Sequence, residues 1–475
     1  MEMETEHQYE LGIIGAGPAG YHAALEAAKY GVSAVLFESR EPGGVCLFEG
    51  CIPTKSLVST SKDYFRLSKS KVVKADTILY DWAAARQKKE RDVKKLAAGL
   101  NMQLKQASVP IVKAAARLHK ADDTGITIAA DGQAYKVQDV ILATGSHNVL
   151  PPIEGLQEAF DARAAFDSTA ILDECAGIGQ LLVIGAGVIG LEIASIYANT
   201  GSEVTILERQ DSFLPGLDDA AKAEYVQSLK RKGIVIKTGQ QVRSVRILQT
   251  QMGDLGITVM ASDGKNGIEE TYMADRVLVA TGRKGCTDHI GLENVPAIQV
   301  KDGFIVTDEQ HRTGCAHIYA CGDVCGREQL AYTAGLAGEQ VVRQISHHCR
   351  VRENGGKDCV PHVVFTNPEA AYIGMTETAC IESGISYRSA DCSMNYSSLF
   401  AVENERETGA FKLLCDEGLH ILGCHIVGNG ASDLIGTIQA YMEAGVTLSE
   451  IERQPVLHPS HMEIVKECIR KFGQL

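Results

Sequence analysis

At 475 residues the chain is too long for a single ordinary hydrophobic core, so its length predicts two to four domains. A hydrophobic fraction of 45% is typical of a globular enzyme. The formal net charge of −14 argues against nucleic acid and anionic membrane as partners, because surfaces that bind phosphate need an excess of Lys and Arg. No apolar run reaches the roughly 18 residues of a membrane span.

The cysteine content and the N-terminal residues indicate a reducing compartment. The 14 cysteines show no framework spacing, which favours reduced thiols over structural disulfides. Residues 1–10 are acidic and contain neither an apolar nor an Arg-rich leader, so we expect a cytoplasmic protein. Cys315, Cys321 and Cys325 match no zinc spacing, and we expect no metal site.

The first predicted unit begins with an apolar strand at residues 11–14, followed by a glycine turn and a helix over 21–29. Its glycines, Gly15, Gly17 and Gly20, have the spacing that lets a backbone approach a pyrophosphate at a helix N-terminus. Glu38 ends the next strand, where a carboxylate can bind the hydroxyls of a ribose. This pattern predicts a dinucleotide site.

Two cysteines follow this unit, in the segment GGVCLFEGCIPTK at residues 43–55. In a regular helix the separation of Cys46 and Cys51 corresponds to a rise of about 7.5 Å, beyond the roughly 7 Å between Cα atoms that a disulfide can bridge. A disulfide here therefore needs an irregular backbone, which Gly50 can supply. Such a local bridge is easily exchanged and is therefore predicted to be catalytic.

A second unit repeats the design of the first, after a charged surface helix predicted at residues 81–106. Its strand covers residues 181–184, its glycine turn is followed by Glu208, and a carboxylate at that position favours NAD over NADP because it repels a 2′-phosphate. We expect the adjacent Arg209 to be a solvated surface residue. The three glycines of the turn are Gly185, Gly187 and Gly190.

Each unit is followed by a strand that ends in Ala-Thr-Gly, at residues 143–145 and 280–282. The duplication predicts an α/β fold with two Rossmann-like dinucleotide-binding domains. Beyond about residue 353, alternating apolar runs such as 363–366 and 411–415, and helices near 435–444 and 462–471, indicate a separate α+β domain. The predicted domains are 1–150, 151–282, a segment 283–352 that completes the first domain, and 353–475.

The ordered motifs resemble those of the class I pyridine nucleotide-disulfide oxidoreductases, and within them the dihydrolipoamide dehydrogenases. The resemblance extends over essentially the whole chain. It includes both glycine fingerprints, both Ala-Thr-Gly strands and the two-cysteine segment, together with YACGD at 319–323, NPE at 367–369, and His458-Pro459 followed by Glu463. It implies that residues 1–150, completed by 283–352, form the FAD domain, that 151–282 form the NAD domain, and that 353–475 form the dimerisation domain. It also implies an obligate homodimer that passes electrons from protein-bound dihydrolipoamide through a redox disulfide and FAD to NAD.

The resemblance also implies a role for each site residue. Cys46 would exchange with the substrate dithiol and Cys51 would face the flavin, while His458, oriented by Glu463, would take the substrate proton. Lys55 would lie beside the flavin and pair with Glu192. The remaining cofactor-binding residues implied are Thr144, Gly145, Gly282, Asp323 and Ala331.

Some positions depart from the family pattern, and these leave the substrate open. They are Val45, Phe48, Thr54, Tyr332 and Val456. One alternative is an NAD(P)H-dependent reductase of another small disulfide, similar to glutathione reductase. Another is a docking subunit of a 2-oxoacid dehydrogenase or glycine cleavage complex. Cys468 is the one cysteine near the C-terminus, so no second redox pair is expected there.

Overall fold

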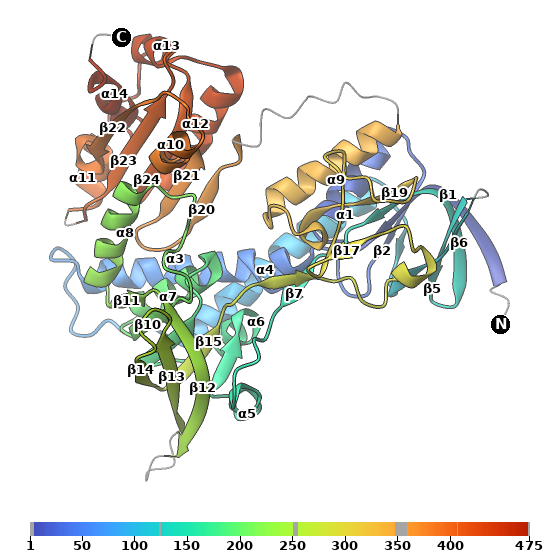
Figure 1. The fold of residues 1–475 in the computed structure, drawn as a ribbon, viewed down its shortest axis with the longest axis horizontal. Helices are drawn as coiled ribbons and strands as arrows, with labels where there is room; N and C mark the ends of the chain where they lie inside the picture. Colours follow the sequence, from blue (N-terminus) through green and yellow to red (C-terminus); the bar gives the residue numbers. More distant parts are fainter. Residues whose placement is uncertain (1–3, 123–124, 250–254, 347–358, 406, 474–475) are drawn as a thin grey trace. The chain divides into compact units, whose positions relative to one another are not determined.

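The computed structural model describes residues 4–122, 125–249, 255–346, 359–405 and 407–473 (Figure 1). Its contacts group into two units, residues 1–56 with 86–149 and 282–352, and residues 57–85 with 150–281 and 353–475. The chain passes from one unit to the other at five points, and two of these lie within helices α3 (Cys51–Ser68) and α4 (Trp82–Gln106). Within the described part of the chain, no helix is both long enough and apolar enough to cross a membrane.

The first unit is built on a seven-stranded sheet in the order β3-β2-β1-β6-β5-β4, with β19 also paired to β6. The predicted strand at 11–14 is the end of the longer β1, in which Ile13 pairs in parallel with both Leu36 and Ile141. Its apolar run is fully buried, as expected for a central parallel strand. The strands are β1 (Glu4–Ile14), β2 (Ala34–Phe37), β3 (Ile111–Val112), β4 (Ala116–Asp122), β5 (Gly125–Ala130), β6 (Gln133–Leu142) and β19 (Ile318–Ala320).

The segment after residue 282 adds β19 to this sheet and a helix to its face. Helix α9 (Ala331–Ile345) lies alongside α1 (Pro18–Lys29), as Figure 1 shows. The two backbones come so close that a Cβ at Gly338 would lie 2.2 Å from the carbonyl oxygen of Ala19. The smaller elements of the unit are α2 (Gly44–Phe48), β7 (Ser146–Asn148), β16 (Arg283–Gly285), η1 (Leu292–Asn294), β17 (Val300–Lys301), β18 (Phe304–Ile305) and η2 (Gly322–Cys325).

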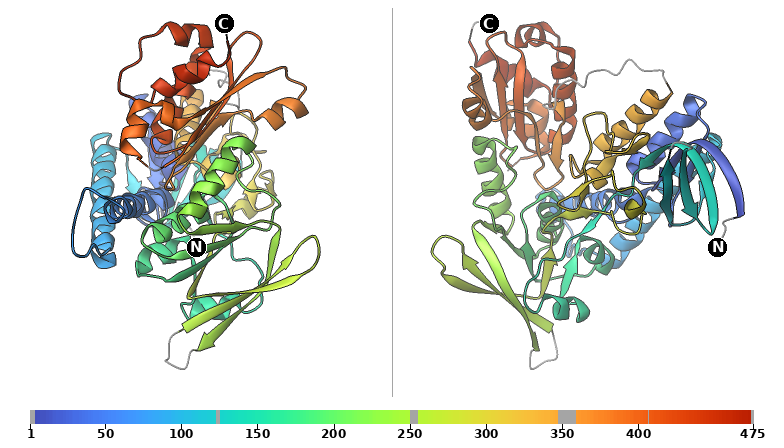
Figure 2. Two further views of the ribbon diagram at one scale, coloured as in Figure 1. Left: turned by 90° about the vertical axis from the view of Figure 1, so that its left-hand side faces the viewer. Right: turned by 45° about the vertical axis from the view of Figure 1, so that its right-hand side comes forward.

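The second unit contains a five-stranded, all-parallel sheet in the order β11-β10-β9-β15-β8. Helix α7 (Val188–Asn199), which follows the second glycine turn, is buried from Gly190 to its end. An antiparallel sheet of β12 (Gln240–Gln249), β13 (Leu255–Asp263) and β14 (Glu269–Ala274) is visible in Figure 2. The other elements are α5 (Leu156–Asp161), β8 (Ala165–Asp167), α6 (Ser168–Glu174), β9 (Gln180–Ile184), β10 (Glu203–Leu207), α8 (Asp219–Arg231), β11 (Ile234–Lys237) and β15 (Arg276–Val279).

The C-terminal part of this unit is a five-stranded antiparallel sheet in the order β20-β21-β24-β23-β22, with helices around it (Figure 2). The structure confirms the predicted α+β class. The elements are β20 (His362–Val364), β21 (Ala370–Gly374), α10 (Glu377–Glu382), β22 (Arg388–Ser393), η4 (Met394–Tyr396), α11 (Ser398–Glu403), β23 (Ala410–Cys415), β24 (Ile421–Val427), α12 (Ala431–Ala444), α13 (Leu448–Arg453) and α14 (Glu463–Arg470).

Only the first part of the apolar run at 363–366 belongs to a strand, because β20 ends at Val364. After Val364, backbone N–H groups donate hydrogen bonds to side chains of α7 instead of to a neighbouring strand. Phe365 donates to Glu192 Oε1 at 2.9 Å, and Asn367 donates to Ser195 Oγ at 2.9 Å. The apolar character of 363–366 therefore reflects burial against α7 as well as strand pairing.

A buried ion pair also connects the C-terminal sheet to α8. Lys412 Nζ lies 3.0 Å from Asp218 Oδ1, and both side chains are only 4% exposed. Asp218 precedes α8 and caps it by accepting a hydrogen bond from Ala220. A second carboxylate, Glu377, lies 3.1 Å from the same ammonium group.

Candidate functional site

The first glycine turn has two glycines that fit against backbone and one that faces open space. A Cβ at Gly15, where φ is +99°, would lie 2.3 Å from the carbonyl oxygen of Ala143, and a Cβ at Gly20 would lie 1.8 Å from the Gly15 oxygen. A Cβ at Gly17 would meet nothing within 4 Å. The turn is therefore tightly closed against the sheet, with an open approach at the N-terminus of α1, which suits a pyrophosphate.

The second turn reproduces this geometry almost atom for atom. A Cβ at Gly185 would lie 2.4 Å from the oxygen of Ala280, and a Cβ at Gly190 would lie 2.3 Å from the oxygen of Gly185. Gly187 again has nothing within 4 Å. The duplication seen in the sequence therefore produces two glycine turns with the same geometry, each suited to a dinucleotide.

The carboxylates that follow the two turns are held in the same way. Glu38 Oε2 accepts a hydrogen bond from the backbone N–H of Ala16 at 2.9 Å, and its Oε1 accepts one from the backbone N–H of Arg40 at 2.8 Å. Glu208 makes the corresponding bonds with Ala186 and Gln210, both at 2.8 Å. Each acid is therefore fixed at the end of its strand beside its turn, where it can bind a ribose. Arg209 is exposed, as expected.

The two Ala-Thr-Gly motifs lead into strands that pair with each other. Antiparallel pairing of β7 with β16 places Gly285 opposite Ser146 and Arg283 opposite Asn148. Gly145 and Gly282 both have positive φ, +75° and +122°, which allows the chain to turn into these strands. Thr144 Oγ1 donates to the carbonyl oxygen of Cys286 at 2.7 Å.

Asp323 lies in η2, close to these paired strands. Ser146 Oγ donates to Asp323 Oδ2 at 2.6 Å, and Arg283 Nε donates to Ser146 Oγ at 2.7 Å. The sequence analysis missed Ser146 and Arg283 as supports of this aspartate. The signal was present, since each of them directly follows an Ala-Thr-Gly motif. Ala331 is the first residue of α9, which starts shortly after this site.

The cysteine pair spans a break between two helices. Helix α2 ends at Phe48, α3 begins at Cys51, and Glu49 and Gly50 form the irregular backbone predicted between them. Gly50 allows the backbone of the break to pass close to α2, because a Cβ at Gly50 would lie 3.2 Å from the carbonyl oxygen of Val45. The φ angle of Gly50 is not positive. The break brings Cys46 and Cys51 into hydrogen-bond contact as two thiols.

The two-cysteine segment at residues 43–55 is anchored to the first glycine turn. Gly43 donates its N–H to the carbonyl oxygen of Ala16 at 2.8 Å, and a Cβ at Gly44 would lie 2.7 Å from the Cα of Gly17. The hydrogen bond to Cys51, followed by burial, raises the pKa of Cys46, whereas the positive charge of Lys55 opposes that rise. The raised pKa favours the protonated thiol of Cys46.

Tyr21 is a further residue near the pair that the sequence analysis did not single out. It follows the first glycine turn directly and is partly buried. Burial, then the charges of Cys46 and Cys51, raise the pKa of its phenol. Its position right after Gly20 is the sequence signal that could have identified it.

Lys55 and Glu192 belong to different units, and their pairing stays a prediction. Lys55 lies one turn after Cys51 on α3. Glu192 is 3% exposed on α7, where its Oε1 accepts the Phe365 hydrogen bond described above.

His458 and Glu463 form the hydrogen-bonded pair that the family resemblance implies. Glu463 is the first residue of α14, and its Oε1 binds His458 Nδ1. Its Oε2 accepts a hydrogen bond from the backbone of Ser398 at 3.0 Å, which fixes the carboxylate. The hydrogen bond with His458 is the main cause of a lowered pKa for Glu463. The imidazole is 72% exposed, so Nε2 is available for proton transfer.

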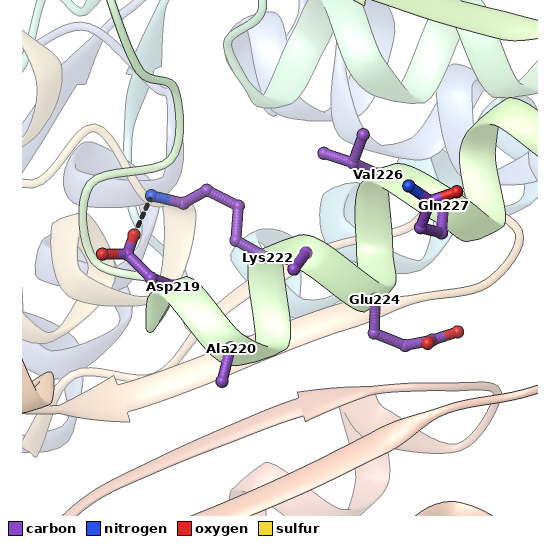
Figure 3. Close-up of a pocket in the computed structure, with 7 residues that line it drawn as sticks. Asp219, Ala220, Lys222, Glu224, Val226 and Gln227 are labelled. Atoms are coloured by element: carbon purple, nitrogen blue, oxygen red, sulfur yellow. Dashed lines mark hydrogen bonds and ion pairs between the residues drawn. The ribbon is translucent and has the colours of Figure 1, made fainter.

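A surface hollow beside α8 contains none of the predicted site residues (Figure 3). In it, Lys222 Nζ lies 3.3 Å from Asp219 Oδ1, an ordinary pair of neighbours on one helix face. The lining residues offer no thiol, imidazole or glycine turn, and we assign them no chemistry. They are Asp219, Ala220, Lys222, Ala223, Glu224, Val226 and Gln227.

Comparison with known proteins places the chain in one family over nearly its whole length. Residues 9–338 match the pyridine nucleotide-disulphide oxidoreductase family, and residues 360–469 match the dimerisation domain of the same family. Dihydrolipoyl dehydrogenase of Geobacillus stearothermophilus is 34% identical over 96% of this chain and 94% of its own. The mitochondrial dihydrolipoyl dehydrogenase of Schizosaccharomyces pombe is 31% identical over 97% of this chain and 89% of its own.

Solved structures agree with this fold. The HOCl-induced flavoprotein disulfide reductase RclA from Escherichia coli is 27% identical and superposes with a TM-score of 0.84, covering 97% of this chain and 99% of that one. LpdA from Mycobacterium tuberculosis, 23% identical, shares the fold with a TM-score of 0.85 over 98% and 100% of the two chains. The chain therefore belongs to the pyridine nucleotide-disulphide oxidoreductases, as a homodimeric flavoprotein disulfide oxidoreductase that uses FAD and NAD.

Proposed function

We propose that this enzyme oxidises protein-bound dihydrolipoamide to lipoamide and passes the two electrons to NAD. The observation that carries the proposal is the hydrogen-bonded pair of Cys46 and Cys51, seated against the first glycine turn through Gly43 and Gly44. The names of the relatives with 30–34% identity point to the same substrate.

In the proposed reaction the pair begins as a disulfide. His458 removes a proton from one substrate thiol, and the thiolate attacks the sulfur of Cys46, so that the bond between Cys46 and Cys51 breaks and Cys51 leaves as a thiolate. The second substrate thiol then attacks the substrate sulfur of the mixed disulfide, the bond from that sulfur to Cys46 breaks, and lipoamide is released. The proton of the second thiol passes to the sulfur of Cys46, which becomes a thiol.

FAD and NAD, when bound, supply the hydride chemistry that returns the dithiol to the disulfide. The residues that would hold FAD are the first glycine turn, Glu38, Asp323 and the paired strands after the Ala-Thr-Gly motifs. Those that would hold NAD are the second glycine turn and Glu208, and this carboxylate favours NAD over NADP. Lys55 would lie beside the flavin with Glu192.

Two features concern the partner subunit and the complex. By family resemblance, His458 of one subunit serves the cysteine pair of the other, which makes the dimer necessary for turnover. We also propose that the dimer docks to a lipoyl-bearing protein of a 2-oxoacid dehydrogenase or glycine cleavage complex, in the cytoplasm.

A second candidate is a reductase of another small disulfide. The similarity in structure to the flavoprotein disulfide reductase of E. coli favours it, as do the departures Val45 and Phe48 beside Cys46. In that case electrons run in the opposite direction, from a nicotinamide nucleotide to the substrate.

Anaerobic stopped-flow absorbance distinguishes the candidates. The purified enzyme is mixed with dihydrolipoamide and then with NAD or, separately, NADP, and its flavin absorbance is followed. In a parallel experiment the oxidised enzyme is mixed with NADPH. Rapid bleaching that NAD reverses supports the proposal. Bleaching by NADPH but not by dihydrolipoamide would contradict it and favour the second candidate, whereas a protein without flavin turnover would be a docking subunit only.

A further inference from the structure

A second pair of cysteines meets inside the C-terminal domain, although the two residues lie far apart in the sequence. Cys392 is on the buried face of β22, the face it shares with Ala390, and Cys468 is on α14. The thiol of Cys468 donates to the carbonyl oxygen of Ala390 at 3.3 Å, and the Cys392 and Cys468 side chains are in hydrogen-bond contact. Cys392 is 5% exposed and Cys468 is fully buried.

Lys471, one turn after Cys468, places a positive charge beside this pair. Its Nζ donates to the carbonyl oxygen of Asp391 at 2.5 Å and also forms a hydrogen bond with the thiol of Cys392. Lys471 itself is exposed, so the pair has one side that lies close to solvent.

The two thiols differ in how readily they ionise. The hydrogen bond between the two thiols, and then the charge of Lys471, lower the pKa of Cys392 against the effect of burial, and the same hydrogen bond raises the pKa of Cys468. Burial raises the pKa of Cys380 in the same domain, as is usual for an inert core thiol. One nucleophilic sulfur beside one protonated sulfur is the arrangement from which a disulfide forms.

We propose that Cys392 and Cys468 form a second dithiol centre, which a hydroperoxide oxidises to a disulfide that joins β22 to α14. The Cys392 thiolate attacks the peroxide and breaks its O–O bond, so that Cys392 becomes a sulfenic acid and water or an alcohol leaves with a proton. The sulfur of Cys468 then attacks Cys392. A disulfide forms, and the hydroxyl group departs as water with the proton of Cys468.

The centre lies outside the chemistry proposed for Cys46 and Cys51, so its test does not depend on the substrate. The FAD-loaded protein is first reduced with dithiothreitol and freed of the reductant, so that both cysteine pairs start as thiols. It is then treated with hydrogen peroxide at a few equivalents and sampled over time. Remaining thiols are alkylated, and the unreduced digest is analysed by mass spectrometry. We expect a linked peptide containing Cys392 and Cys468, and a loss of alkylation at Cys392 roughly tenfold or more faster than at Cys380.

Three variants sharpen the test. Cys392→Ser removes the linked peptide, whereas the matched control Cys380→Ser retains it. Lys471→Gln keeps both thiols in place and slows the loss of Cys392 alkylation severalfold, which keeps the proposal testable even if Cys392→Ser fails to fold. The proposal is overturned if wild type yields no linked peptide while Cys46 and Cys51 become oxidised, or if Lys471→Gln reacts at the wild-type rate.

Discussion

Two alanine substitutions in the second glycine turn should separate folding from nucleotide binding. In Gly190→Ala the new methyl would lie 2.3 Å from the Gly185 oxygen and 3.2 Å from Val183 Cγ1, whereas ordinary contact begins near 3.4 Å. Helix α7 must therefore shift by about 1 Å although it is buried from that residue onward. Overpacking of this kind costs about 1–3 kcal/mol. At about 2 cal/mol/K of unfolding entropy per residue over a unit of about 280 residues, we expect the apparent Tm to fall by roughly 2–5 °C.

Gly187→Ala is the matched control, because that position has φ of −72° and nothing within 4 Å. Alanine fits there without strain, so the Tm should stay within error of wild type. The methyl, however, enters the open space in front of α7 where we expect the pyrophosphate. The Kd for NADH should rise about tenfold, equivalent to about 1.4 kcal/mol.

The assay combines thermal unfolding with titration of NADH fluorescence, and bound flavin is measured as a control for the first unit. Wild-type affinity in Gly187→Ala would show that the pyrophosphate does not approach this glycine. A wild-type Tm in Gly190→Ala would show that α7 can shift freely and that the packing argument is wrong.

Three further predictions concern His458 and the buried ion pair. His458→Gln should slow flavin reduction by dihydrolipoamide about 10²–10⁴-fold in stopped flow with flavin content unchanged, and wild-type rates would mean that another base acts. Lys412→Met should lower the free energy of unfolding in urea by about 3–5 kcal/mol, because Asp218 loses its buried partner. The double variant with Asp218→Asn should recover part of that loss, and no recovery would contradict the pairing. Burial would raise the pKa of Asp218, but hydrogen bonds from the backbone N–H of Glu377 and from the Lys412 ammonium outweigh burial and lower the pKa. The stabilisation by this carboxylate is therefore present above about pH 4 and is lost as the pH falls further. Acid unfolding of wild type compared with Asp218→Asn measures this loss.

Much of the fold and the two nucleotide turns followed from local sequence patterns. Strand, glycine turn, helix and carboxylate lie within one short segment, and the order of residue types there fixes the backbone geometry. The helix break at Gly50 was predicted in the same way, from the reach of a disulfide against the rise of a helix. The surface helix expected at 81–106 is α4.

Contacts between distant segments could not be predicted from such patterns. Ser146 reaches Asp323, and Cys392 reaches Cys468, only after segments from different parts of the chain have packed together. In the sequence, Lys412 looks like any other lysine in a strand, and only the folded structure shows that it is buried beside Asp218. Spacing along one element carries no information about the element that packs across from it. The domain boundaries and the catalytic roles remain predictions.

The backbone bonds of Glu38 and Glu208 have a thermodynamic consequence for the two nucleotide sites. The turn itself holds each carboxylate through Ala16 or Ala186, so the rotamer of the acid does not depend on a ribose. Little side-chain conformational entropy of the glutamate is then lost when the ribose binds, because its carboxylate oxygens are already held in position. The same two glutamates therefore act as part of the backbone scaffold, and removing one perturbs the shape of its turn together with its affinity for ribose.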